Sequence, residues 1–191
     1  GFYLRPKLVP VAKARKIKKS YVVVFYQVDG ENKAGAYSAL LSSSGGFSKK
    51  PKLVLESFYG NSSSPEVAPT WLKQNPNGGY LLGVRRIESD DFQTQRGHMV
   101  QLNKGGKKKK DIALDAGDNV GEVNCEVISD DRILVNWYDY NSGIATNQMF
   151  DASLNPVGDS YRAYAGVCNY SLLNKVGDNL YQLFKVSFLG F

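Results

Sequence analysis

An internal repeat is the feature that most constrains how this chain can fold, because a repeat imposes the same local structure several times over. Each copy holds a moderately apolar segment, a turn, a strongly β-prone strand, a polar loop and two more strands joined by a Gly-rich or Asn-Pro turn. The second strands begin at Tyr21, Tyr80, Ile133 and Leu180, with spacings of 59, 53 and 47 residues. Four short strands every ~40–50 residues predict propeller-type blades, which bury their faces by stacking on one another.

The repeats predict a single domain over residues 1–191, with copies at about 9–56, 67–115 and 121–165 and a partial copy at 167–191. The expected fold class is all-β, a β-propeller-like array of about three and a half four-stranded repeats. A β-sandwich is the alternative, because short strands with turns every 8–12 residues also fit that fold. Three alternatives stay open for the incomplete copy: a strand from residues 2–9 completes it, the chain belongs to a larger ring, or another subunit supplies the missing strands.

The third copy also resembles a known type of repeat. Its run ISDDRILVNWYDYNSGIATNQMFDASLNPVGDSYRA is similar to four-stranded repeats in large secreted or surface bacterial proteins. The pattern departs at Asp131 and Leu154, where Gly is usual. The resemblance implies a propeller-like repeat, an extracellular or cell-surface location, and turn or packing roles in place of catalytic ones. The matching residues are Trp137, Gln148, Phe150, Asp151, Asn155, Pro156, Val157 and Gly158.

Composition excludes several other classes of protein. With 42% hydrophobic residues and 12 Tyr, the chain is too apolar and aromatic to be disordered. The longest purely apolar run, Tyr21–Tyr26, is too short to cross a membrane. Two Cys exclude a disulfide-dense scaffold and a four-Cys zinc site, and no motif calls for a metal or cofactor. Because the chain starts with Gly1 and not Met, we expect it to be processed, trimmed or an excerpt.

Charge is distributed unevenly along the chain. Residues 1–60 carry eleven Lys/Arg against three Asp/Glu, residues 61–120 carry nine against seven, and residues 121–191 carry four against eight. A basic end and an acidic end predict either a polyanion-binding first third or head-to-tail pairing of unlike faces. The alternative is chance variation among solvated surface residues.

Two basic runs are the candidate polyanion- or partner-binding residues. The second run is expected to form a hairpin loop that projects into solvent. No nucleic-acid signature accompanies the runs and no aromatic residue is interleaved with the lysines, so the sequence does not favour nucleic acid. The alternative to a binding role is that the lysines belong to a solvated loop and that their charges discourage edge-to-edge pairing of strands. The residues are Lys13, Arg15, Lys16, Lys18, Lys19, Lys107, Lys108, Lys109 and Lys110.

No constellation of residues predicts catalysis. His98 has no carboxylate or nucleophile nearby in the sequence, so we interpret it as a structural or surface residue. The acidic pairs at 90–91, 115–118 and 130–131 fall in turns, where Asp bonds the local backbone. Such pairs would also fit a glycosidase or an oxygen-ligated calcium ion, but no calcium-loop motif is present.

The tryptophans and cysteines are expected to be structural. Trp71 and Trp137 lie in predicted strands and should pack between neighbouring sheets, whereas exposed rings would instead fit sugar stacking. Cys125 and Cys168 lie in the first strands of successive copies, and we expect two free, buried thiols.

The leading functional hypothesis is therefore a non-enzymatic binding or assembly module that mediates protein–protein or self-association. The first alternative is a carbohydrate-binding, lectin-like propeller. The second is a polysaccharide-active enzyme that uses the turn carboxylates. The fold alone does not choose among the three, because propellers host all of them.

Overall fold

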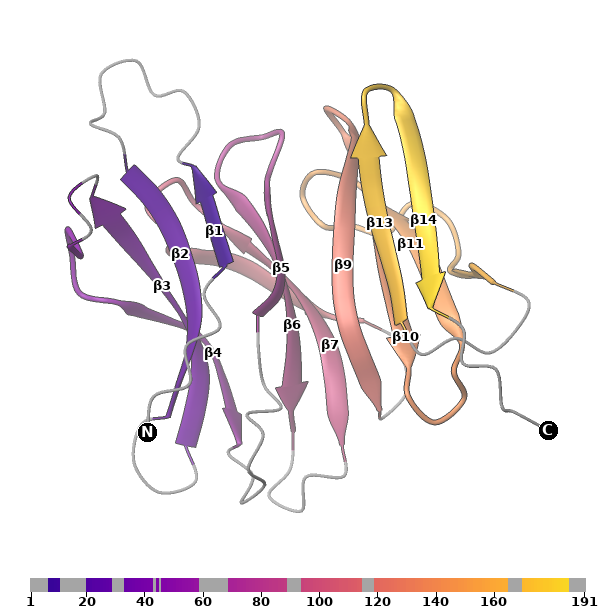
Figure 1. Ribbon diagram of the computed structural model, residues 1–191, viewed down its shortest axis with the longest axis horizontal. Helices are drawn as coiled ribbons and strands as arrows, with labels where there is room; N and C mark the ends of the chain where they lie inside the picture. The colour runs from indigo at the N-terminus through magenta and orange to yellow at the C-terminus, as the bar shows by residue number, and fades with distance from the viewer. Residues whose placement is uncertain are drawn as a thin grey trace.

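The computed structural model describes residues 7–10, 20–28, 33–42, 44, 46–58, 69–88, 94–114, 119–164 and 170–185. These residues form strands and turns and contain no helix, which confirms the all-β prediction. It follows that none of the described segments is a helix of the length and apolarity that crossing a membrane requires. The strands group into three four-stranded antiparallel sheets and one two-stranded sheet (Figure 1).

The first sheet contains β1 (Lys7–Pro10), β2 (Ser20–Val28), β3 (Lys33–Ser42) and β4 (Lys52–Phe58), in that order. Its β1 pairs with β2 over four residues. Residues 7–9 therefore belong to the first sheet and do not complete the last one, and residues 2–6 lie outside the described part of the chain.

The second sheet repeats the same meander with β5 (Pro69–Gln74), β6 (Tyr80–Ile87), β7 (Gln95–Leu102) and β8 (Lys108–Ala113). Its β6 is buried along most of its length because other sheets cover both of its faces. This explains why β6 is a nearly continuous apolar run and not an alternating one.

The third sheet contains β9 (Val120–Ser129), β10 (Arg132–Asp139), β11 (Ala145–Phe150) and the two-residue edge strand β12 (Tyr161–Arg162). Among the described residues, the fourth consists of β13 (Tyr170–Val176) and β14 (Asn179–Lys185). The described part of the chain thus holds three four-stranded sheets and one two-stranded sheet, in the order in which the sequence predicts three full copies and a partial one.

The four sheets follow one another along the long axis of the molecule (Figure 1). Their first strands adjoin: β1 contacts β5, β5 contacts β9, and β9 contacts β13. One apolar cluster, which includes Val22, Leu55 and Leu82, fills the space between the first two sheets. A second, which includes Met99, Val123 and Trp137, fills the space between the second and third.

Polar side chains fasten each sheet to a turn of the next. Ser38 on β3 donates a hydrogen bond to the carbonyl oxygen of Gly106 in the β7–β8 turn. One sheet later, and two residues further along the equivalent strand, Gln101 on β7 donates to the carbonyl of Ala152 in the β11–β12 connection at 3.2 Å. The cross-strand neighbour of each is a lysine, Lys52 in the first sheet and Lys110 in the second. The repeat thus reproduces a junction between sheets as well as a sheet.

Candidate functional site

The structure places the predicted basic runs differently from one another. Residues 13–19, which hold the first run, lie outside the described residues. In the second run only Lys107 lies in the turn, because β8 begins at Lys108 and the three following lysines are strand residues. The expected projecting hairpin loop is therefore wrong: cross-strand pairing with Gln101 and Leu102 continues through this segment.

Two of these lysines have structural partners. The Lys110 ammonium donates to the carbonyl oxygens of Ser153 and Leu154 and to Oδ1 of Asn155, at 2.8, 3.2 and 2.9 Å. It thereby fastens β8 to the β11–β12 connection. Lys108 forms an ion pair with Asp111 at 3.2 Å. Lys107 and Lys109 are exposed.

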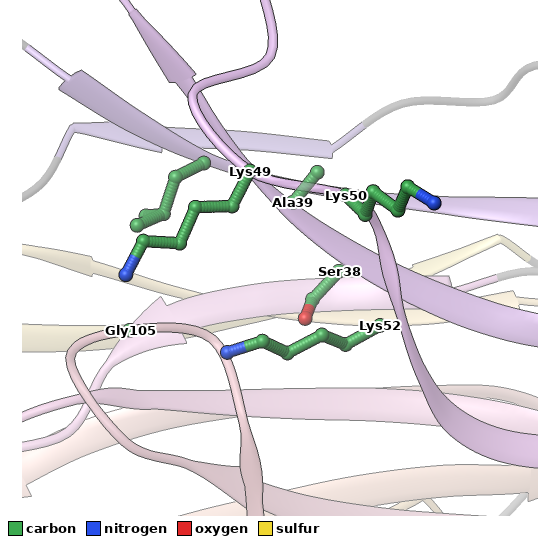
Figure 2. A pocket seen from close by; sticks show the side chains of 7 residues that line it. Ser38, Ala39, Lys49, Lys50, Lys52 and Gly105 are labelled. Carbon is green, nitrogen blue, oxygen red and sulfur yellow. The ribbon is translucent and has the colours of Figure 1, made fainter.

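A second group of lysines, which the sequence reading did not single out, lines a pocket beside the first sheet. The residues that line this basic cleft are Ser38, Ala39, Leu40, Lys49, Lys50, Lys52 and Gly105. Lys49 and Lys52 extend toward the turn that carries Gly105, whereas the Lys50 ammonium points away from it (Figure 2). No acidic residue lines the cleft, and within the described residues no carboxylate pairs with these three lysines.

The turn opposite those lysines has its backbone amides engaged. The N–H groups of Gly105 and Lys107 donate to Oδ1 of Asn103, and that of Gly106 donates to the Asn103 carbonyl. Three N–H groups of the turn are therefore engaged within the turn itself. Any anion in the cleft would be held by lysine side chains.

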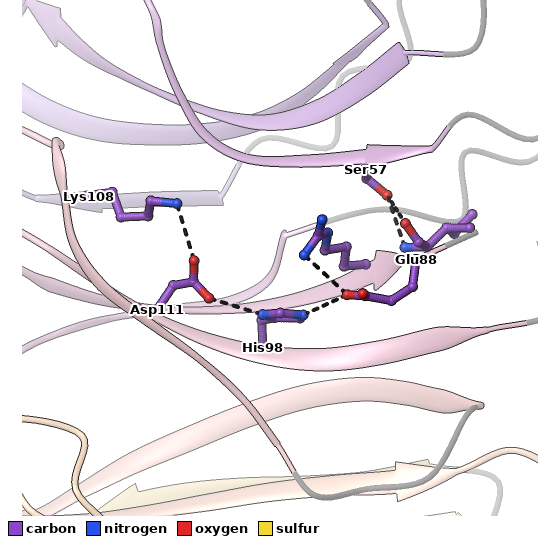
Figure 3. Close-up of polar contacts among 7 residues, drawn as sticks. Ser57, Glu88, His98, Lys108 and Asp111 are labelled. Carbon is purple, nitrogen blue, oxygen red and sulfur yellow. Dashed lines mark hydrogen bonds and ion pairs between the residues drawn. The ribbon is translucent and has the colours of Figure 1, made fainter. Parts of the chain in front are cut away.

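His98 on β7 lies between two carboxylates, which corrects the expectation that no acidic group is near it (Figure 3). Its Nε2 is 3.1 Å from Oε1 of Glu88, and its Nδ1 is 3.2 Å from Oδ1 of Asp111. Arg86 pairs with Glu88 at 3.2 Å, and Lys108 pairs with Asp111, so a row of alternating charges crosses the second sheet. Both imidazole nitrogens are therefore within hydrogen-bonding distance of a carboxylate oxygen.

This environment affects the titration of Asp111. Burial by itself raises the pKa of Asp111, but hydrogen bonds from Lys108 and His98, together with their charges, bring that pKa below its usual value. The imidazole is 4% exposed and both of its nitrogens are occupied. The arrangement joins β7 to β8 and to the residue after β6, in keeping with the structural role that the sequence predicts for His98.

The remaining candidates divide between turns and core. Asp131 lies in the β9–β10 turn, where it accepts from Ser129 and pairs with Arg132. The acidic pairs at 90–91 and 115–118 fall outside the described residues. Across the part of the chain that the structure describes, no group of three His, Cys, Asp or Glu side chains is placed to hold a metal ion.

Both tryptophans pack between sheets, as predicted. Trp137 is buried in the cluster between the second and third sheets. Trp71 packs against the same cluster, and its Nε1 donates to the carbonyl of Cys125 at 2.8 Å. Cys125 is a free and fully buried thiol, which confirms the expectation for this residue, and burial raises its pKa to about 12. Cys168 lies outside the described residues.

A ladder of buried asparagines was missed by the sequence reading. Asn124, Asn136 and Asn147 stand side by side on β9, β10 and β11. Asn136 donates to Oδ1 of Asn147 at 2.8 Å and accepts from Asn124 at 3.2 Å. The three asparagines are twelve and eleven residues apart in the sequence, and these intervals match the pairing of two successive hairpins. This spacing is the sequence signal from which the ladder could have been predicted.

The two ends of the ladder attach the fourth sheet to the third. Asn124 donates from Nδ2 to the carbonyl of Ser171 at 2.8 Å and accepts at Oδ1 from the N–H of Leu173 at 3.0 Å. Its amide group thus bonds β13 as a neighbouring strand residue would. At the other end, Asn147 donates to Gln182 on β14 at 2.8 Å.

Comparison of the chain with protein-family models, with curated proteins and with solved structures gave no significant match. The functional argument therefore rests on the residues and their geometry.

Proposed function

We propose that this chain is a non-enzymatic assembly module, in which the last sheet of one copy stacks on the first sheet of another. The observation that carries the proposal is that large apolar side chains are exposed on both outer sheets of the array. Repeat arrays need polar outer faces on their terminal units to stay monomeric and soluble, because each unit buries its faces only against its neighbours.

The outer face of the fourth sheet supports this proposal. Leu183 and Tyr181 on β14 are 58% and 51% exposed, and Val176 at the end of β13 is 58% exposed. These side chains alternate with Gln182 and Leu173, which point toward the third sheet. In addition, β14 has no further strand beside it among the described residues, and an open strand edge is a template for pairing.

The first sheet has a comparable outer face. Tyr37 and Leu41 pack around Ala39 in a small cluster on the side of β3 opposite the main core. Beside them, Leu53 on β4 and Phe47 in the β3–β4 connection are 42% and 57% exposed. The two ends of the array therefore offer faces of the same apolar character as those that stack inside it.

The adjoining first strands support a ring as the form of the assembly. Blades of a propeller stack around an axis with one strand of each blade innermost, and closed rings contain about four to eight blades. Two copies of about three and a half sheets would supply about seven. Because the two surfaces in contact differ, each contact is heterologous, and a ring of two copies closes through two of them.

The charge gradient predicted from the sequence does not fall on these faces. The fourth sheet carries Lys175 and Lys185 against Asp178, so the acidic surplus of residues 121–191 does not lie on it, and the expected pairing of a basic face with an acidic one is wrong for this sheet. The acidic residues of the last third instead belong mostly to the third sheet and its turns. Apolar burial must hold the contact, and added salt should not dissolve it.

Sedimentation velocity at 0.05 and 0.5 M salt tests the proposal. We expect a species of twice the chain mass at micromolar concentration, at both salts. Leu183→Asp should give a folded monomer, because it places a charge in the contact. Val157→Asp is the matched control and should remain dimeric, since Val157 is 37% exposed but lies in the connection after β11 and not on an outer face. A compact native monomer at every concentration would refute the proposal.

A further inference from the structure

The basic cleft between the first two sheets is distinct from the outer faces used for assembly. Lys49 and Lys52 approach the Gly105 turn from the first sheet (Figure 2). Together with Lys50, they make three lysines that line the cleft where two consecutive sheets meet. Their charges have one sign, and no acidic side chain in the lining offsets them.

The neighbouring junction shows what a lysine beside a turn of the next sheet does when that turn offers it acceptors. Lys110, cross-strand to Gln101, donates to three oxygen atoms of the next turn. Lys52, cross-strand to Ser38, lies two residues away from the corresponding register position, and within the described residues no oxygen of the 103–107 turn accepts from it. The lysines of the first junction therefore have no hydrogen bonds to the facing turn, whereas Lys110 in the second junction has three.

The chemistry of the cleft distinguishes among anions. The amides of the Gly105 turn are already bonded to Asn103, so the cleft lacks the backbone nest that grips a single phosphate. The cations are lysines, which act as point charges and do not form the bidentate contacts that arginine makes with phosphate. No aromatic ring lines the cleft on which a nucleic-acid base could stack. Several point charges at a junction of sheets suit a flexible ligand polymer that carries anionic groups at intervals along its length.

We infer that the basic cleft, through Lys49 and Lys52 facing the Gly105 turn, binds a linear anionic polysaccharide that carries sulfate or carboxylate groups. The polymer lies across the junction of the first and second sheets and contacts the lysines that line the cleft. Each contact is individually weak and exposed to solvent, so affinity comes from their number and depends on salt.

The probe is a fluorescently labelled heparin-derived octasaccharide, and the measurement is anisotropy titration from 0.05 to 0.3 M salt. We expect saturable binding that weakens with salt. The double variant Lys49→Gln/Lys52→Gln should bind about tenfold more weakly, at about threefold for each charge removed. Its plot of log affinity against log salt should be shallower by roughly one unit for each lysine lost.

Lys185→Gln is the control for the loss of a positive charge, one against the two that the double variant removes, because Lys185 is an exposed lysine on β14, at the opposite end of the array (Figure 1). It should bind the octasaccharide as the unmodified chain does. Circular dichroism and the unfolding midpoint of each variant establish that the fold is kept. An octasaccharide affinity that is equal in the double variant and the control would overturn the inference.

Two further probes separate the sources of negative charge. A labelled oligothymidylate of similar total charge and vesicles containing phosphatidylserine are titrated under the same conditions. We expect both to bind more weakly than the octasaccharide and with less loss in the double variant. Equal or tighter binding of either probe, lost with the same two lysines, would assign the cleft to nucleic acid or to a lipid surface and overturn the assignment to polysaccharide.

Discussion

Replacing Asn124 by Ala should detach the fourth sheet from the third while the rest of the array stays folded. The Asn124 side chain accepts from the N–H of Leu173 and donates to the carbonyl of Ser171, both in the interior. Alanine would leave these two backbone groups without partners where water does not readily replace them. It would also remove the bond to Asn136.

The expected cost follows from the number of groups left unpaired. A buried donor or acceptor without a partner costs about 1–3 kcal/mol, so the two backbone groups together should cost about 2–4 kcal/mol after partial relaxation. Two kcal/mol is roughly a thirtyfold change in an opening equilibrium. Because the fourth sheet has two strands among the described residues, against four in each of the others, local opening should account for most of the effect.

Hydrogen exchange measured by mass spectrometry is the suitable assay, because it reports opening segment by segment. We expect amides of β13 and β14 to lose roughly thirtyfold or more of their protection in the Asn124→Ala variant, and those of β6 and β7 to lose much less. Asn141→Ala is the control, since Asn141 is exposed in the β10–β11 turn and its replacement should shift stability by no more than about 0.5 kcal/mol. Protection of β13 and β14 within about threefold of the unmodified chain would refute the reasoning that Asn124 stands in for a strand.

Three other predictions concern separate parts of the molecule. Gly79→Ala should lower the free energy of unfolding by about 3 kcal/mol in urea denaturation, because a Cβ at φ +87 would collide with the Leu102 carbonyl. Gly158→Ala is the comparison: Gly158 has φ +78 but open space around it, so its replacement should lower the free energy of unfolding by only about 1 kcal/mol. The lowered pKa of Asp111 means that its contribution to stability is present above its unfolded pKa of about 3.9 and is lost as pH falls through its folded value. Asp111→Asn should therefore flatten the loss of stability between pH 5 and 2, and an unchanged slope would contradict the pairing with Lys108 and His98. In a Cys168→Ser variant, the thiol of Cys125 should not react with a disulfide reagent until the protein unfolds, because burial raises its pKa to about 12; rapid labelling of the native protein would contradict this.

How far the sequence predicts the fold depends on the range of the interaction. The second strand predicted to begin at Tyr80 is β6, which begins at that residue, and the one predicted to begin at Ile133 is β10, which begins one residue earlier. Both were predictable because apolar runs bounded by turns are local signals. The lysines of β8 were mistaken for a loop because charge resembles a loop signal, whereas β8 is an edge strand that tolerates exposed lysine.

The departure at Leu154 shows how packing overrides a turn preference. Gly is usual at this place in the repeats that the third copy resembles, and Leu154 indeed adopts φ 60, a conformation that favours glycine. Its side chain is 1% exposed in the cluster between the second and third sheets, so burial offsets the backbone cost. A full leucine burial is worth about 1.5–3 kcal/mol, against about 1–2 kcal/mol for the left-handed backbone.

The candidate sites lay further beyond sequence reasoning because their residues meet only after the strands are in register. Glu88, His98 and Asp111 come from three places in one sheet, and the cleft joins Lys52 to a turn more than fifty residues away. No local sequence pattern predicts that the Lys110 ammonium has hydrogen-bond acceptors in the next turn, or that the Lys52 ammonium has none within the described residues.

The order of pairing has a consequence for how the chain folds as it is made. Every neighbouring pair of strands within a sheet is also adjacent in the chain, so each sheet can pair without waiting for residues that follow it. The second sheet spans Pro69 to Ala113, a stretch that a ribosome extends in about 2–9 s at 5–20 residues per second. Hairpins form in about 1–10 μs, so each sheet has time to pair and to stack on its predecessor before the next is synthesised. Synthesis from the N-terminus would thus build the array one sheet at a time, with each new sheet covering the face that its predecessor left open.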